Sequence, residues 1–521
     1  MDCATDALIP ILNITNPFTQ EQVKEGFQRW PKTLKAATKR TASFAKLKGT
    51  LKNQSEKEVL TPFNTLSELT KTLDPLLRES TDVEKEGYSQ VCFQGNPWSS
   101  LNSIPFALLF LSIYKSYIVP AFGVLIPLIS WILPYVFIKA FYNIPISFSE
   151  YTKILWRMWN GQAMPKSPQD LLSPPPPGPT DVFSQMKQLA QTGWTLFTLG
   201  QAMWQPIQQA RHFMRLDVDC IKLGESVLSV KGVALELWGK WSTWLPSWLG
   251  DWIHLCPSTA REAFAFSLET PFWIQYVLRA VGRLEVLLKL ALRSDIVPAQ
   301  FVRSKTPLIV LKGTGDPSIP MESRVVSSVS LGGSGSGSGS GNGSGNGNAP
   351  QHAILTGPNR GGKSSFLRAV LMNVQLAHCF GAAFAEKAQL SHFSWIANGM
   401  SLEDTPGETS MFEREVAFAS GVLQKKDSDG FGLLLYDELF HSTNPPDATR
   451  TSQMFCSKLW AKKNVLSIVS THVYSLAKEA PENLVKKLCV AAWKPFHFSY
   501  TIQRGVCEVS SVDLVLKQYG L

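Results

Sequence analysis

The residues best suited to chemistry lie in one short stretch, ILTGPNRGGKSSF, from Ile354 to Phe366. It contains the pattern G-x-x-x-x-G-K-[ST], with Gly357, Gly362, Lys363 and Ser364 in the required places. Glycines at these positions let backbone N–H groups turn toward an anion, the lysine reaches the β- and γ-phosphates, and the serine hydroxyl ligates Mg²⁺. The stretch therefore predicts a phosphate-binding loop for a nucleotide and its magnesium ion.

A second stretch, LLLYDELFHSTNPPD, carries Asp437 and Glu438 directly after an apolar run. Such a run is typical of a central parallel strand, and the carboxyl end of that strand is where an α/β sheet binds its ligands. We expect Asp437 to hold Mg²⁺ through water and Glu438 to orient or deprotonate the attacking water. A lone histidine after a strand is more often structural, but His472 follows the apolar run LSIV and both nucleotide motifs, so we expect it to sense the γ-phosphate.

The elements around these motifs must bring them together. Three apolar residues enter the loop as a buried strand would, and FLRAVLMNVQLA leaves it as a helix whose N-terminus faces the phosphates. The acidic pair and His472 each follow an apolar run of their own. This alternation predicts an α/β domain with the functional residues at one edge of its sheet.

With these motifs in place, the residues resemble those of the MutS-type ATPases, a branch of the ABC-like nucleotidases. Thr356 to Ser365 resembles the family's loop TGPN-x-GGKS-[ST], in which Pro-Asn is more specific than the general pattern. Gly407 to Phe412, with Glu415, resembles the family's G-x-S-T-F-x-x-E element. The resemblance implies that the following residues bind the nucleotide: Gly357, Pro358, Asn359, Arg360, Gly361, Gly362, Lys363, Ser364, Ser365 and Ser410.

The resemblance covers about residues 270 to 521 and implies a P-loop ATPase domain of the ABC/MutS type, with a mixed sheet flanked by helices. It implies ATP and Mg²⁺ as ligands, with Ser364 and Asp437 at the metal and Lys363, Glu438 and His472 in catalysis. In the family two such domains pair head to tail, which implies a dimer, with Ser410 completing the neighbour's site. The chain departs from the family in having Asp316-Pro317 where His-Pro is usual.

The chain of 521 residues, 44% of them hydrophobic, is long enough for two or three domains. A mainly α-helical N-terminal half is predicted to precede the α/β domain. The predicted segments are a helical basic region at 1–95, a hydrophobic helical hairpin at 96–150, a Pro-rich linker at 151–180, a helical lever domain at 181–302, and the ATPase domain at 303–521 with a flexible Gly/Ser/Asn insertion at 331–348.

Two features of the N-terminal half indicate an anionic or lipid partner. The net charge is +9, and residues 28–54 contain eight basic residues and no acid, which predicts a helical face that could touch phosphate groups of DNA, RNA or lipid. The stretch 116–138 carries no charged residue and lies between Lys115 and Lys139. A helix of that length spans a hydrocarbon core, so 104–148 predicts membrane association; the alternative is a buried helix pair.

The eight cysteines are scattered without a C-x-x-C pair, and the first residues lack the basic start of a signal peptide. Both observations favour an intracellular, reducing compartment.

Three functional classes follow. The first is a DNA-binding ATPase in repair, recombination or genome maintenance, without a mismatch-reading module. The second is a membrane-tethered mechanical ATPase that does not recognise DNA. The third and weakest is a structural protein with a vestigial site.

Overall fold

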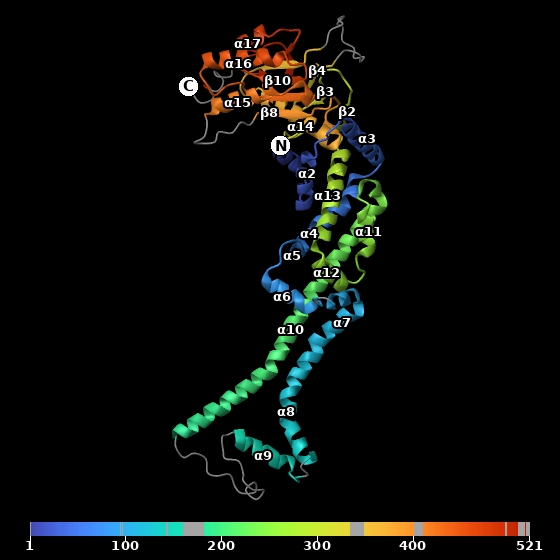
Figure 1. The fold of residues 1–521 in the computed structure, drawn as a ribbon, viewed down its shortest axis with the longest axis vertical. Helices are drawn as coiled ribbons and strands as arrows, with labels where there is room; N and C mark the ends of the chain where they lie inside the picture. The colour runs from blue at the N-terminus through green and yellow to red at the C-terminus, as the bar shows by residue number, and fades with distance from the viewer. Residues whose placement is uncertain are drawn as a thin grey trace. The chain divides into compact units, whose positions relative to one another are not determined.

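The computed structural model describes residues 2–93, 95, 97–141, 144–159, 182–333, 349–400, 410–494, 497–508 and 516. The chain forms two compact units (Figure 1). Unit 1 comprises Met1–Ser67 and Leu278–Leu521, and unit 2 comprises Glu68–Val277. These boundaries differ from the five predicted segments, because the segment Met1–Ser67 clusters with the C-terminal part of the chain.

Unit 1 is built around a six-stranded sheet in the order β12-β11-β5-β10-β9-β8. Five of its strands are parallel and β12 is antiparallel to β11, so the predicted mixed sheet is confirmed. The strands are β5 (His352–Thr356), β8 (Trp395–Gly399), β9 (Gly432–Tyr436), β10 (Val465–Ser470), β11 (Val485–Lys494) and β12 (His497–Arg504).

Helices cover both faces of this sheet, which is why β5, β9 and β10 are buried along their whole length. Alternate residues point to opposite sides, as strand geometry requires. Leu355, Leu433 and Leu435 pack with α14 (Lys363–Phe380), while Ile354 and Leu434 lie in the core that includes α15, α16 and α17. These three helices are Met411–Gln424, Pro445–Trp460 and Tyr474–Glu479.

A smaller sheet in the order β2-β7-β3-β4 completes the α14 side of the core. Its strands are Gln300–Phe301, Lys387–Leu390, Leu308–Thr314 and Ser327–Gly332, and β1 (Ile296–Pro298) pairs separately with β6 (Ala382–Phe384). The predicted insertion at 331–348 therefore begins too early. Leu331 is fully buried in the core and, with Gly332, belongs to β4; residues 334–348 lie outside the described part.

The N-terminal helices α1 (Asp2–Ile11), α2 (Pro17–Gln28) and α3 (Leu34–Leu51) pack against α14. Trp30 stacks on His378 with ring centroids 4.2 Å apart and donates its indole N–H to the Phe393 carbonyl at 2.9 Å. Both His378 ring nitrogens have partners, and burial lowers the pKa of this histidine to about 3. His378 is therefore a neutral packing residue that joins the N-terminal segment to the sheet domain.

Unit 2 is helical, and the predicted helical N-terminal half is confirmed. Its elements are α5 (Asp74–Leu77), α6 (Asp82–Val91), a 3₁₀ helix (Trp98–Ser103), α7 (Pro105–Ile113), α8 (Val119–Phe141), α9 (Phe148–Trp159), α10 (Val182–Trp241), a 3₁₀ helix (Ser242–Trp244), α11 (Trp248–Leu255) and α12 (Ala260–Glu269). Two helices, α4 (Glu56–Thr72) and α13 (Pro271–Leu292), have residues in both units.

The hydrophobic segment is helical from Pro105 to Phe141 without a turn, because a π-helix at Tyr114–Ile118 connects α7 to α8. Within the segment 96–150, for which a helical hairpin was predicted, the residues from Pro105 to Phe141 therefore contain no turn. The segment Pro105–Pro127 is long and apolar enough to span a membrane by length and composition, and 11% of its tested stretch is buried. The first part of the predicted linker, 151–159, belongs to α9, and residues 160–181 lie outside the described part.

Candidate functional site

Three neighbouring parallel strands place the predicted site residues at one sheet edge. β10 lies between β5 and β9, so the loops that follow the three strands leave the same end of the sheet. Beside them lies a cavity of about 420 Å³. It is lined by residues 359–366, by residues between Thr314 and Ser327, and by Glu438 and Tyr500. Its volume is within the range of small-molecule sites.

The loop between β5 and α14 has the backbone that its glycines allow. Gly362 caps α14 with φ +96°, a left-handed conformation that favours glycine, and Arg360 has φ +62°. The helix begins at the next residue, Lys363, so its unsatisfied N–H groups and the positive end of its dipole lie beside the cavity. Residues 357–365 can therefore cradle an anion with backbone N–H groups.

Lys363 is buried, and its ammonium group is held by the loop itself. Nζ donates to the carbonyl oxygens of Gly357 at 2.9 Å and Pro358 at 3.0 Å, and lies 3.5 Å from Nε2 of His472. Burial lowers the lysine pKa, while Glu438 and Asp437 oppose that shift. The lysine is thus positioned at the cavity floor by neutral carbonyl groups and can transfer its hydrogen bonds to a phosphate.

Asp437 and Glu438 follow β9 and are fixed by Ser470, the last residue of β10. The Ser470 hydroxyl donates to Oδ1 of Asp437 at 2.5 Å and accepts the backbone N–H of Glu438 at 2.8 Å. The sequence analysis assigned no role to Ser470. The structure shows that this hydroxyl links the ends of two strands and orients the acidic pair.

Glu438 and His472 face each other across the site. Glu438 has φ +51°, an unfavourable backbone for this residue, and its Oε1 lies 3.6 Å from Nε2 of His472. Burial lowers the pKa of His472, Lys363 lowers it further, and Glu438 raises it. Three of the five non-glycine residues with positive φ in the described chain, Arg360, Glu438 and Tyr500, line the cavity. Backbone strain gathered in this way is typical of functional sites.

The segment between β3 and β4 forms another wall of the cavity and contains Asp316-Pro317. Asp316 is buried and accepts hydrogen bonds from the backbone N–H and hydroxyl of Ser318, at 3.0 and 2.5 Å. Its other carboxylate oxygen accepts from Nε of Arg368 at 3.0 Å. Because Arg368 belongs to α14, this ion pair joins the wall to the helix that follows the phosphate loop.

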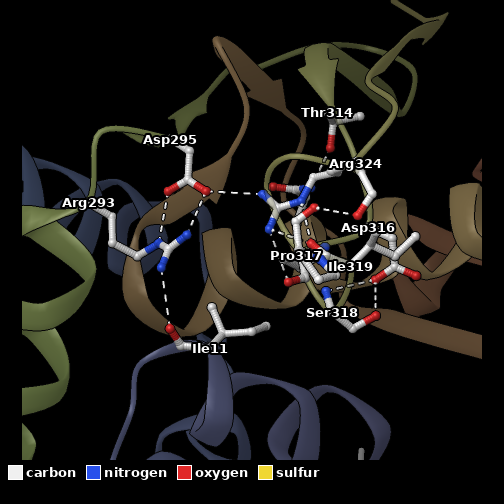
Figure 2. Close-up of polar contacts among 12 residues, drawn as sticks. Ile11, Arg293, Asp295, Thr314, Asp316, Pro317, Ser318, Ile319 and Arg324 are labelled. Carbon is white, nitrogen blue, oxygen red and sulfur yellow. Dashed lines mark hydrogen bonds and ion pairs between the residues drawn. The ribbon is translucent and has the colours of Figure 1, made fainter.

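Arg324 also fixes this wall (Figure 2). Its guanidinium donates to the carbonyl oxygens of Pro317 and Ile319 and to Oδ2 of Asp295, each at about 3.1 Å. Asp295 also accepts from Arg293, which in turn donates to the carbonyl of Ile11 at 3.3 Å. The cavity wall is therefore tied to the end of α13 and to α1. No motif in the sequence indicates this network.

Tyr500 lies in β12, lines the cavity and has φ +55°. An aromatic ring at a cavity wall can stack on a nucleotide base. The sequence analysis did not identify this residue, because a tyrosine in a strand carries no signal of its own.

Ser410 lies apart from these groups and does not line the cavity among the described residues. It caps α15, accepting the backbone N–H of Glu413 at 3.2 Å, and is exposed. The preceding residues of the resembling element, 407–409, lie outside the described part of the chain. Glu415 is fully buried, and its carboxylate accepts from the Ser442 hydroxyl and lies 3.0 Å from Nδ1 of His441. It thereby joins α15 to the loop that follows Glu438.

The donor set fits a magnesium nucleotide. The loop offers backbone N–H groups and one lysine to phosphates, Ser364 contributes a hydroxyl to the cavity, and Asp437 offers a carboxylate at the same sheet edge. Hydroxyl and carboxylate oxygens are ligands that Mg²⁺ prefers. Ser364 and Asp437 could therefore hold the metal ion.

The chain is similar to known proteins over the segment that contains these site residues. Residues 353–517 match the family model of MutS domain V. The DNA mismatch repair protein MutS of Leuconostoc mesenteroides is 29% identical over 163 residues, which are 30% of this chain and 19% of that protein. The DNA mismatch repair protein MSH3 of Pyricularia oryzae is 32% identical over 134 residues, 25% of this chain and 11% of that protein. The chain thus spans a fifth or less of the length of these relatives.

Proposed function

Because its residues 353–517 make the chain a member of the MutS-type ATPase family, we propose that it binds ATP with Mg²⁺ in the 420 Å³ cavity and hydrolyses it. The observation that carries the proposal is the convergence of Lys363, the Asp437-Glu438 pair and His472 at the ends of three neighbouring strands. A structural protein with a vestigial site would have no need to keep these groups together.

Each group has a proposed task. Residues 357–365 bind the phosphates through backbone N–H groups, and Lys363 contacts the β- and γ-phosphates. Ser364 and Asp437 hold Mg²⁺, which supplies positive charge to the triphosphate when bound. Glu438 orients or deprotonates the attacking water, and His472, 3.6 Å away, holds the water or senses the γ-phosphate.

The proposed active form is a dimer of ATPase domains. Ser410 does not line the cavity of its own subunit among the described residues, and its position at the exposed N-terminus of α15 suits a contact with another molecule. A helix N-terminus favours a phosphate group electrostatically. We therefore assign Ser410 to the nucleotide site of the partner subunit, with ATP bridging the two domains.

DNA is the proposed macromolecular partner, because the matched relatives are DNA mismatch repair proteins and the net charge is +9. We expect one DNA form to raise the ATPase rate about tenfold, the size of a typical coupling between sites. The test compares the rates without DNA and with duplex, mismatched or branched DNA, at low and physiological salt. Lys363→Ala serves as the blank. A rate that is indifferent to every DNA form would refute DNA coupling.

A second candidate function, a membrane-tethered ATPase, is favoured by the exposed apolar surface of α8. Ile126 and Leu133 are 59% and 60% exposed, and most other large hydrophobic side chains between Phe122 and Phe141 are exposed as well. Soluble proteins rarely expose contiguous apolar surface on this scale. A helix of 23 residues is about 34 Å long, close to the thickness of a hydrocarbon core. The two functions are compatible in one membrane-anchored DNA ATPase.

Membrane attachment predicts that the full-length protein stays with the membrane fraction in alkaline carbonate and is released by detergent. Ile126→Lys with Leu133→Lys is expected to release it, because each lysine at the centre of a span costs about 3 kcal/mol. The matched control is Val326→Lys with Met454→Lys, which changes two side chains that are 52% and 56% exposed in unit 1. Release of the unmodified protein by carbonate alone would contradict membrane attachment.

A further inference from the structure

Helix α3 carries a concentration of positive charge that the nucleotide site does not use. Residues 28–54 contain eight lysines and arginines and no aspartate or glutamate. Five of these cations, Lys35, Lys39, Arg40, Lys46 and Lys48, belong to α3. The helix packs against β2 and against α14, within unit 1 (Figure 1).

Two of the five cations face inward and fix the helix in place. Arg40 donates to the carbonyl oxygen of His378 at 2.9 Å, and Lys48 donates to those of Arg293 at 2.7 Å and Ala291 at 3.2 Å. Phe44, Leu47 and Leu51 are buried on the same side. The rotation of α3 about its axis is thereby set, so its opposite face has a defined composition.

That outer face is a row of lysines. Lys35, Lys39 and Lys46 lie within about 40° of one another around the helix axis and span about 16 Å along it. All three are exposed, as is Lys32 just before the helix. No ion pair joins Lys32, Lys35 or Lys39 to a carboxylate among the described residues, whereas exposed lysines elsewhere, such as Lys71 and Lys240, pair with glutamates of their own helices.

Two further exposed cations belong to the segment after β2. Arg303 and Lys305 are exposed and follow β2, the strand against which α3 packs. The positive charges of Lys32, Lys35 and Lys39 repel one another, and the phosphates of a polyanion would relieve that repulsion. Counterions that were condensed on the polyanion are released when these lysines bind its phosphates. The surface therefore fits an extended chain of phosphates better than a single small anion.

The composition of the outer face favours a rigid polyanion over a lipid surface. Between the lysines stand Thr38, Ala42 and Ser43, and no large hydrophobic side chain of α3 is exposed. Helices that lie in a membrane interface bury an apolar face among the acyl chains. On α3 the apolar face is already used against the core of unit 1, so only charge and small polar groups are available outside.

We propose that the outer face of α3, with Lys32, Lys35, Lys39 and Lys46, binds the phosphate backbone of duplex DNA. The contacts are to phosphates, so they set affinity and position without reading sequence. The choice of DNA as the polyanion rests on the proposed function, whereas the location of the surface rests on the structure. The surface lies outside the 353–517 segment that matches the family model.

The test uses the full-length protein and a fluorescent duplex DNA in titrations at several salt concentrations. The variant Lys32→Gln/Lys35→Gln/Lys39→Gln is expected to bind at least about tenfold more weakly at physiological salt, and to lower the slope of log affinity against log salt by nearly 3, since each phosphate contact contributes about 0.9. The matched control, Lys57→Gln/Lys458→Gln/Lys463→Gln, removes the same charge from exposed lysines elsewhere in unit 1 and should bind within twofold of the unmodified protein.

The same proteins are also titrated with vesicles that contain anionic lipid. The proposal would be overturned if the unmodified protein did not bind DNA, or if the two triple variants lost DNA affinity equally. It would also be overturned if the Lys32/Lys35/Lys39 variant lost affinity for the vesicles and not for DNA. A fluorescent ATP analogue is titrated into the same preparations. Nucleotide binding should be unchanged in both triple variants, which shows that they are folded. Absence of nucleotide binding in the unmodified protein would instead reject the proposed ATPase function and leave the DNA titration to decide the role of α3 by itself.

Discussion

Lys363→Ala is expected to weaken ATP binding by roughly 100-fold or more, since a charge-assisted contact to phosphate is worth about 1.5–3 kcal/mol and the lysine reaches two phosphates. Nζ is held at the cavity floor by the carbonyl oxygens of Gly357 and Pro358, so the ammonium group is already placed where the phosphates enter. Alanine is compatible with the helical backbone at this position and removes the ammonium group together with its aliphatic chain. Titration of a fluorescent ATP analogue measures the effect.

The control for this variant is Lys387→Ala, which removes an exposed lysine of unit 1 at the start of β7. It should bind the analogue as the unmodified protein does. Thermal unfolding of both variants establishes that the fold is kept, and loss of a buried cation held mainly by carbonyl groups should not lower the stability. Binding by Lys363→Ala within about threefold of the unmodified protein would reject the phosphate-loop assignment, because a threefold change is well under about 1 kcal/mol.

Glu438→Gln is expected to leave ATP binding intact and to slow hydrolysis by about 100- to 10,000-fold, the usual contribution of a general base. Glutamine has the same shape and keeps the position fixed by the Ser470 hydroxyl, which accepts the backbone N–H of residue 438. It cannot take a proton from water. ATP that is bound and not hydrolysed should also hold the dimer together.

Two measurements check this variant: single-turnover hydrolysis of radiolabelled ATP, and the molar mass in solution with and without ATP and Mg²⁺. The matched control is Glu479→Gln, which changes an exposed carboxylate at the end of α17, away from the residues assigned to the site. It should hydrolyse ATP at a nearly normal rate. Normal hydrolysis by Glu438→Gln would show that another group activates the water, and the nearest alternative is His472 at 3.6 Å.

The parts of the site that are local in the chain could be predicted from it. The loop from Gly357 to Ser365 is followed directly by α14, and Asp437 and Glu438 follow a strand whose residues are all buried. In these cases the motif and the element that presents it are neighbours in sequence. Ser470, Tyr500 and the Arg324 network were missed, since their roles depend on partners that belong to other elements, far away along the chain.

In the N-terminal half, too, local features could be predicted from the sequence and long-range contacts could not. Its helical character and its charge pattern could be predicted, because helix periodicity and composition are local properties. The packing of Met1–Ser67 with the C-terminal part could not, because it depends on contacts between segments that are distant in sequence, such as that of Trp30 with His378. The uninterrupted helix through Tyr114–Ile118 was also missed. A π-helix is rare and has no simple local sequence pattern that would predict it.

By itself, the sequence determined the chemistry available to this protein: a phosphate-binding loop, an acidic pair after a buried strand, a histidine after another, a basic helix and a charge-free apolar segment. Only the tertiary structure decided which of these groups share a site. Parallel pairing of β5, β10 and β9 brings three loop ends to one sheet edge, and docking of α3 on the core turns its lysines outward. Both are consequences of burying apolar surface between segments that are distant in the chain, which no local pattern can specify.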